Sequence, residues 1–127
     1  MTPALTLTLL ADTYAICRLP VGEPVAAPRP GSFSLLVYAR EETTFVCPSD
    51  QVPAGADVEA GWRCFGIEQT FDFSIPGILV SVLSPLAQAG IGIFATSTFS
   101  TDYVLVKAFD AERAVEALRA AGHVVEA

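Results

Sequence analysis

The feature that most constrains this chain is a run of 29 residues without a charged side chain, residues 73–101. A run of that length is long enough to cross a bilayer as a helix. Residues 77–89, however, repeat apolar side chains at helical spacing on one side and place Ser81, Ser84 and Gln88 on the other. A membrane-spanning helix has no use for this polar stripe. We therefore predict an amphipathic helix followed by strands, and no membrane span.

The second half of the chain divides into short elements at residues that begin or end helices. Ser74 is the expected N-cap of the first helix and Gly90 its end, while Asp110 and Gly122 bound the second helix. The predicted elements are a strand at 67–73, a helix at 77–89, strands at 91–96 and 103–107, a helix at 111–121 and a strand at 124–125. This β-α-β-β-α-β order is the ferredoxin-like arrangement, so the predicted fold class is α+β.

The first half shows strand patterns without an equivalent first helix. Residues 20–31 contain four prolines and two glycines, which exclude a stable helix there. Elsewhere the pattern predicts strands at 5–9, 13–19, 32–38, 43–47 and 63–67, with a short helix near 56–61.

Composition excludes several classes of function. The chain has 127 residues, 52% of them hydrophobic, which is more apolar surface than a small monomer readily buries, so we predict a homodimer or higher even oligomer. Its net charge of −7 argues against binding to nucleic acid or to an anionic membrane surface. The N-terminus lacks the basic segment of a signal peptide, and Cys17, Cys47 and Cys64 form no CxxC pair. We therefore predict a cytoplasmic protein with reduced thiols.

Catalytic motifs are scarce in the sequence. We predict no metal site, because no cluster has metal-ligand spacing, and the three cysteines lie in apolar strands without an adjacent base. His123 follows the predicted end of a helix, where we expect an exposed residue favoured by the helix dipole. The chain also lacks a phosphate-binding glycine loop and a GxSxG turn. The prediction is therefore a non-enzyme with no catalytic residues and no cofactor.

The run GILVSVLSPLAQAGIGIFATSTFSTDYVLV, residues 77–106, resembles the ACT domain, a small-molecule sensor module of amino-acid metabolism. The resemblance is strongest to short bacterial tandem ACT proteins and to the ACT units of CASTOR-type arginine sensors. Segments YAICRLP, FVCPSDQVP and GWRCFGIE extend it into the first half. The resemblance implies two ferredoxin-like ACT units in tandem, residues 1–69 and 70–127, the first with its first helix replaced by the Pro-rich loop.

The resemblance also implies a ligand site. In ACT proteins of this branch, amino acids bind between two units, against the start of the first helix and the Ser/Thr-Asp block. The implied ligand-binding residues are Ser74, Ile75, Pro76, Gly77, Ile78, Thr98, Phe99 and Asp102. The helix start would attract a carboxylate, and Asp102 would suit a cationic amine or guanidinium. The alternative for residues 97–102 is an ordinary hairpin turn, in which Ser, Thr and Asp are common.

Two classes of function follow. The first is a stand-alone regulatory module that binds an amino acid or similar small molecule and passes its state to a protein partner. The second is a structural or interaction protein that kept the ACT scaffold without a ligand, because fold alone does not fix function.

Overall fold

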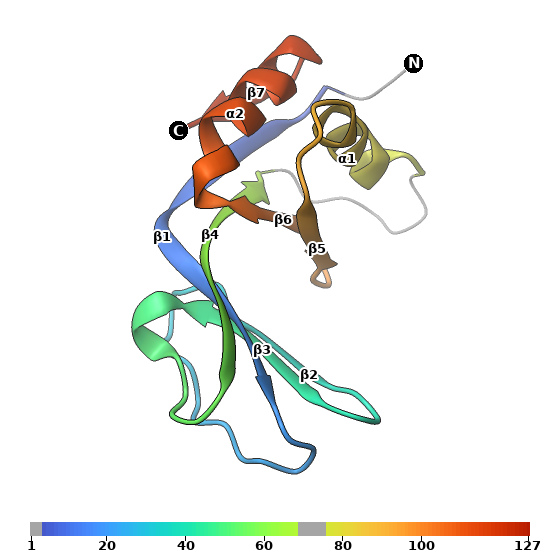
Figure 1. Ribbon diagram of the computed structural model, residues 1–127. Coiled ribbons are helices and arrows are strands. Elements are labelled where there is room, and N and C mark those ends of the chain that lie inside the picture. Colours follow the sequence, from blue (N-terminus) through green and yellow to red (C-terminus); the bar gives the residue numbers. More distant parts are fainter. Residues whose placement is uncertain (1–3, 69–75) are drawn as a thin grey trace. The chain divides into compact units, whose positions relative to one another are not determined.

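The computed structural model describes residues 4–68 and 76–127, and this part contains seven strands, two α-helices and two short 3₁₀ turns (Figure 1). The chain separates into two compact units. We call residues 1–11 with 63–127 the helical unit, and residues 12–62 the strand unit. Strands β1 (Thr6–Leu19) and β4 (Asp57–Ile67) contribute residues to both units. The strand order is β2-β3-β1-β4-β6-β5, and β7 pairs with β1.

The helical unit has the predicted β-α-β-β-α-β order. After the end of β4 come α1 (Ile78–Gln88), β5 (Ile93–Ser97), β6 (Asp102–Lys107), α2 (Ala111–Ala120) and β7 (Val124–Glu126). Both helices agree with the prediction to within one residue at each end. Asp110 is the N-cap residue of α2 as predicted, but its carboxylate pairs with Arg113 at 2.6 Å and does not cap the helix.

The start of β1 completes the sheet of the helical unit. Thr6 pairs with Val124 in a parallel register with β7, and the carbonyl of Thr6 accepts a hydrogen bond from the N–H of Glu68 at 2.9 Å. The first residues of the chain's first strand thus lie between the end of β4 and β7. The compact units therefore differ from the predicted domains 1–69 and 70–127. The predicted boundary between residues 69 and 70 lies outside the described residues, as does most of the strand predicted at 67–73.

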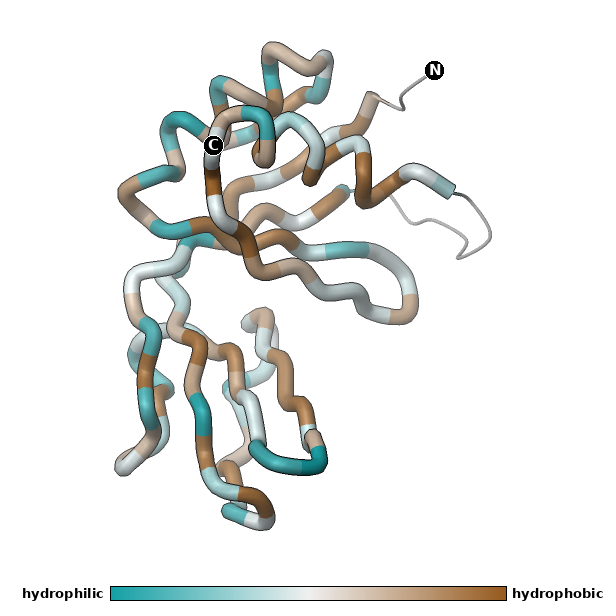
Figure 2. The backbone as a smooth tube through the Cα atoms, turned by 45° about the vertical axis from the view of Figure 1, so that its right-hand side comes forward, coloured by the Kyte–Doolittle hydropathy of each residue, from teal (hydrophilic) through white to brown (hydrophobic). Residues whose placement is uncertain are grey.

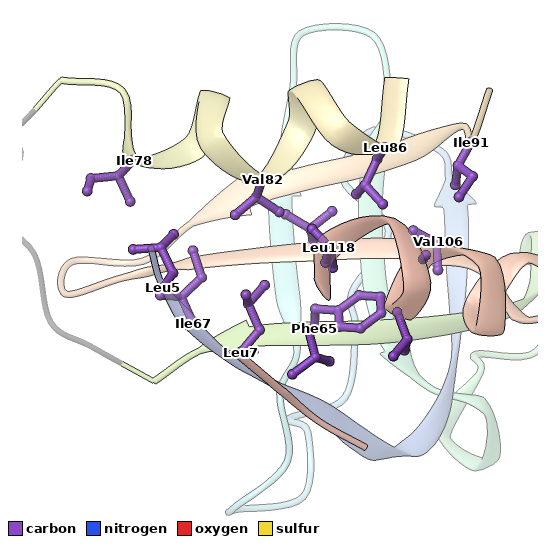
Figure 3. Packing of buried hydrophobic residues seen from close by; sticks show 14 residues of the cluster. Leu5, Leu7, Phe65, Ile67, Ile78, Val82, Leu86, Ile91, Val106 and Leu118 are labelled. Carbon is purple, nitrogen blue, oxygen red and sulfur yellow. The ribbon is translucent and has the colours of Figure 1, made fainter. Parts of the chain in front are cut away.

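The core of the helical unit lies between the two helices and the sheet (Figure 3). Helix α1 contributes Ile78, Val82 and Leu86 to it, as its predicted apolar stripe requires. The other labelled members come from the residue before β1, from β1, β4, β6 and α2, and from the residues after α1: Leu5, Leu7, Phe65, Ile67, Val106, Leu118 and Ile91. Burial of each large aliphatic side chain contributes about 1.5–3 kcal/mol, so this cluster fixes both helices on one face of the sheet.

His123 is buried, with 4% of its surface exposed, so the prediction of an exposed residue is wrong. Its Nδ1 accepts the N–H of Leu5 at 3.0 Å, which leaves the proton on Nε2. That Nε2 lies 2.7 Å from the carbonyl oxygen of Ser81 and donates to it. A neutral imidazole therefore joins the residue before β1 to α1 through two main-chain hydrogen bonds.

Pro85 explains why the carbonyl of Ser81 is available to His123. In an α-helix this carbonyl would accept the N–H of residue 85, and proline has none. Ser81 itself is 3% exposed, and its hydroxyl donates to the carbonyl of Ile78 at 2.6 Å. Ser81 was predicted on the polar stripe opposite the apolar face, yet it is buried, and its hydroxyl and carbonyl both have hydrogen-bond partners within the protein.

The strand unit has a smaller core. It contains the second part of β1, β2 (Leu35–Tyr38), β3 (Thr43–Pro48), the 3₁₀ turn η1 (Ser49–Gln51) and the first part of β4. Its core cluster is Ala15, Cys17, Leu19, Phe45 and Cys47. Figure 2 shows hydrophobic and hydrophilic residues alternating along these strands. Residues 20–31 form neither helix nor strand, as the prolines predicted. The strand predicted at 32–38 begins only at Leu35, and residues 57–61 belong to β4 and not to the predicted helix.

Candidate functional site

A groove of about 720 Å³ runs between α1 and α2 and begins at the start of α1. Its volume falls in the range of small-molecule sites. Small side chains line most of the groove, so a ligand could come close to the backbones of both helices. The lining residues are Pro76, Gly77, Val80, Ser81, Ser84, Pro85, Gln88, Ala89, Ala117, Ala120 and Ala121.

Gly77 shapes the start of α1. It is the N-cap residue, with φ +83°, a left-handed conformation that glycine adopts without a steric penalty. Ser74 is therefore not the N-cap residue, and it lies, with Ile75, outside the described residues. The N–H of Ser81 bonds to the carbonyl of Gly77 at 3.0 Å, so the helical ladder begins there. No side chain caps the helix within the described part of the chain, so the first-turn N–H groups are suited to an anion.

The residues on either side of Gly77 differ in how much of their surface a ligand could contact. Pro76 is exposed and lines the groove. Ile78 is only 7% exposed, and its side chain belongs to the core, so a ligand would meet its backbone alone. Ser84 and Gln88, which the sequence placed on the polar stripe of the helix, line the groove although they were not among the predicted site residues. The polar stripe was the signal that could have identified them.

The Ser/Thr-Asp block forms the turn between β5 and β6. Ser97 pairs with Asp102 in the strand register, and its hydroxyl donates to Oδ1 of that carboxylate. The N–H of Thr98 donates to the carbonyl of Thr101 at 2.8 Å. The hydroxyl of Thr101 donates to the carbonyl of Ile67 at 3.2 Å, which ties the turn to the end of β4. These bonds are those of a well-ordered hairpin turn.

The structure brings only part of the predicted site together. Pro76 and Gly77 line the groove, whereas Thr98, Phe99 and Asp102 are not among its lining residues. Phe99 is 89% exposed at the tip of the hairpin. The side chain of Asp102 is partly exposed, and Oδ2 has no hydrogen-bond partner among the described residues.

The three cysteines are buried, as the sequence indicated. Burial raises the pKa of the Cys64 thiol to about 12, and it also raises the pKa of Cys47 to about 12 and that of Cys17 above its usual value. A thiol with such a pKa carries almost no nucleophilic thiolate near neutral pH.

In the described ranges 4–68 and 76–127, no three His, Cys, Asp or Glu side chains gather as a metal ion would require. Nor does either range hold a helix with the length and apolar character needed to cross a membrane.

Comparison with known proteins assigns the family. A family profile described as the ACT domain matches residues 57–120, half of the chain. The chain belongs to the ACT-domain family. The match begins at the start of β4 and ends with α2, so it includes the start of α1 and the hairpin turn.

Solved structures extend this similarity over nearly the whole chain. An Agobacterium tumefaciens protein is 38% identical, with a TM-score of 0.90, and the alignment covers 98% of this chain and 93% of that one. A Vibrio cholerae protein described as of unknown function and a possible transport protein has 17% identity and a TM-score of 0.70, over 94% and 91%. The regulatory subunit of aspartate kinase from Thermus thermophilus has 15% identity and a TM-score of 0.66, over 94% and 98%. No curated protein matches the chain.

Proposed function

We propose that this ACT-domain chain is a regulatory module that binds a small molecule, most simply an amino acid, and carries out no catalysis. Membership of the ACT family and the fold shared with an aspartate kinase regulatory subunit support the regulatory role. The proposal includes two ACT-like units in tandem, resembling short bacterial ACT proteins and CASTOR-type sensors, and a cytoplasmic location.

The observation that carries the proposal is the start of α1. Gly77 exposes its backbone there because it has no side chain, and no heavy atom outside its immediate neighbours in the chain lies within 4 Å of the position that a Cβ would occupy. The uncapped N–H groups of the first turn meet this opening, and the helix dipole adds about 0.3–2 kcal/mol of attraction for a carboxylate. Every amino acid carries that carboxylate, so this feature suits the whole class of ligand.

The hairpin turn supplies the specificity in this proposal. We assign Thr98, Phe99 and Asp102 to a surface that faces the ligand when a second ACT unit covers the start of α1. A second copy of the chain is the proposed source of that unit. Oδ2 of Asp102, which has no hydrogen-bond partner among the described residues, would pair with a cationic amine or guanidinium.

A thermal-shift screen against the twenty amino acids tests the proposal. A ligand at a hundred times its dissociation constant adds about 2.7 kcal/mol to the free energy of unfolding. We expect at least one amino acid to raise the melting temperature. Asp102→Ala should abolish the shift caused by cationic amino acids, whereas Asp12→Ala, which removes an exposed carboxylate from the strand unit, should leave it unchanged.

An interaction protein without a ligand is the second candidate. The observation that favours it is the hydrogen bonding within the hairpin turn, which satisfies Ser97, Thr98 and Thr101 internally. If none of the twenty amino acids stabilises the protein, this second function replaces the first.

A further inference from the structure

A second, smaller pocket lies on the opposite flank of α2 from the α1–α2 groove. It has a volume of about 300 Å³ and shares no lining residue with that groove. Leu9 and Val115 give it an apolar floor, and four charged side chains surround them: Arg63, Glu112, Glu116 and Arg119. All of these residues belong to the helical unit.

Arg63 is held in this pocket by one main-chain contact. Its Nη2 donates to the carbonyl of Leu10 at 3.0 Å, which fixes the guanidinium plane. Its Nε is buried and has no hydrogen-bond partner among the described residues. Buried donors in folded proteins are nearly always paired, so a buried guanidinium N–H that lines a cavity indicates an acceptor that occupies the cavity.

Arg119 is held in the same manner. Its Nη2 donates to the carbonyl of Val125 at 2.6 Å. The ion pairs that join described residues lie elsewhere, and none of them uses Arg63 or Arg119. Each guanidinium therefore keeps donors for an oxyanion, and the fork of Arg63 matches the geometry of a carboxylate.

Two glutamates give the pocket its second charge. Glu112 and Glu116 lie one helical turn apart on α2, and both line the pocket. Like charges at this spacing repel each other, so a cation between them is favoured. Neither carboxylate forms an ion pair with another described residue.

We propose that this pocket binds a small zwitterion with an apolar side chain. Its carboxylate accepts from Arg63 Nε and from Arg119, its ammonium lies between Glu112 and Glu116, and its side chain covers Leu9 and Val115. The proposal concerns a site separate from the start of α1, so it does not depend on the proposed function.

Nuclear magnetic resonance of the arginine Nε–H groups tests the site directly. Three probes separate the contacts: L-leucine, 4-methylpentanoate, which lacks the amine, and 3-methylbutylamine, which lacks the carboxylate. We expect the Arg63 Nε–H signal to move with L-leucine and 4-methylpentanoate and to stay with 3-methylbutylamine. The proposal is overturned if neither carboxylate moves the Arg63 or Arg119 signal at about 20 mM, where a millimolar site is well occupied.

Two variants test the named residues. Arg63→Lys keeps the charge and removes the fork, so it should weaken L-leucine binding at least tenfold, whereas Arg18→Lys in the strand unit should not change it. If Arg63→Lys fails to fold, the double variant Glu112→Gln with Glu116→Gln, at two exposed positions, provides the test. It should weaken the binding of L-leucine and leave the binding of 4-methylpentanoate unchanged. Equal affinity for L-leucine before and after that double change would overturn the assignment of the ammonium.

Discussion

At the scale of single residues, Gly77 has the clearest physical role. Its backbone occupies the left-handed region at φ +83°, and nothing lies within 4 Å of the position a Cβ would take. Substitution would thus be opposed by backbone strain and not by crowding. A valine at this position would confound a binding test with that strain, so the ligand site is better tested at Asp102.

Gly77→Ala should lower the free energy of unfolding by about 1–2 kcal/mol, because L-residues other than Asn and Asp rarely adopt this conformation. Gly77→Asn should cost less, since asparagine tolerates it. The matched control is Gly92→Ala, at a glycine that also has open space but no positive φ. Urea denaturation gives the three values. Equal losses for Gly77→Ala and Gly92→Ala would contradict the role of φ.

Cys64 permits a prediction about pH. Its thiol pKa is raised from 9.0 to about 12 by burial, so the folded protein holds this proton to higher pH than the unfolded chain. The stabilising contribution is complete below pH 9 and is lost as the pH rises toward 12, because the unfolded state then binds fewer protons. Iodoacetamide at pH 8 should label the native thiol about a thousandfold more slowly than in urea. Rapid labelling of native Cys64 would show that the thiol is accessible.

At the scale of elements, α1 and His123 form one hydrogen-bonded unit. Pro85 leaves the carbonyl of Ser81 without its helical donor, and the Nε2–H of His123 replaces that donor. The same imidazole satisfies the N–H of Leu5. The hydrogen bond that Pro85 removes from α1 is thus replaced by one from His123, which lies 38 positions after Pro85 in the chain.

A double-mutant cycle measures this compensation. His123→Ala should lower the free energy of unfolding by about 2–4 kcal/mol, because it leaves two buried main-chain groups unpaired. In the background of Pro85→Ala, an alanine N–H can satisfy Ser81, so the loss should shrink by about 1 kcal/mol. Chemical denaturation of the four proteins gives the coupling. A coupling energy of zero would mean that the two residues act independently.

The elements differ in how well the sequence predicts them. Periodicity placed α1 and α2 to within a residue, because local apolar spacing and terminal glycines determine those helices. It missed that β1 is continuous from Thr6 to Leu19 and that residues 57–61 extend β4. The burial of His123 was also missed, since its partners, Leu5 and Ser81, are distant in sequence. The pairing of β7 with β1 likewise depends on contacts between the two ends of the chain.

The candidate site was only partly predictable for a related reason. Gly77 lines the groove, and it could be singled out from the sequence because a glycine before an apolar helix is a local signal; its contact with a ligand stays a prediction. The groove beside it depends on which face of α2 approaches α1, and Ala117 and Ala120 give no local sign of this. The pocket around Arg63 gave no signal either, since β4 and α2 are separated by more than forty residues.

At the scale of the whole molecule, the apolar excess of the sequence predicts self-association. Exposed apolar residues occur on the strand β2, where Val37 is 40% and Tyr38 70% exposed, and on α1, where Val80 is 64% exposed. Strand β2 is the terminal strand of the sheet, so its outer edge is available for pairing.

Sedimentation tests this self-association and the surface that mediates it. We expect a dimer at micromolar concentration. Val37→Lys should dissociate a dimer formed through the strand edge, and Val80→Lys one formed through the helix face, in either case without loss of fold, since both side chains are exposed. A stable monomer for the unmodified chain would contradict the prediction.

The central claim is that the start of α1 receives the carboxylate of an amino acid, and backbone amide resonances test it most directly. Among the amino acids that raise the melting temperature, at least one should shift the N–H signals of residues 77–80 more than those of the strand unit. These shifts should saturate with the same dissociation constant as the thermal stabilisation. If amino acids stabilise the protein and none of them changes the signals of residues 77–80, their carboxylates bind elsewhere and the account of this site is wrong.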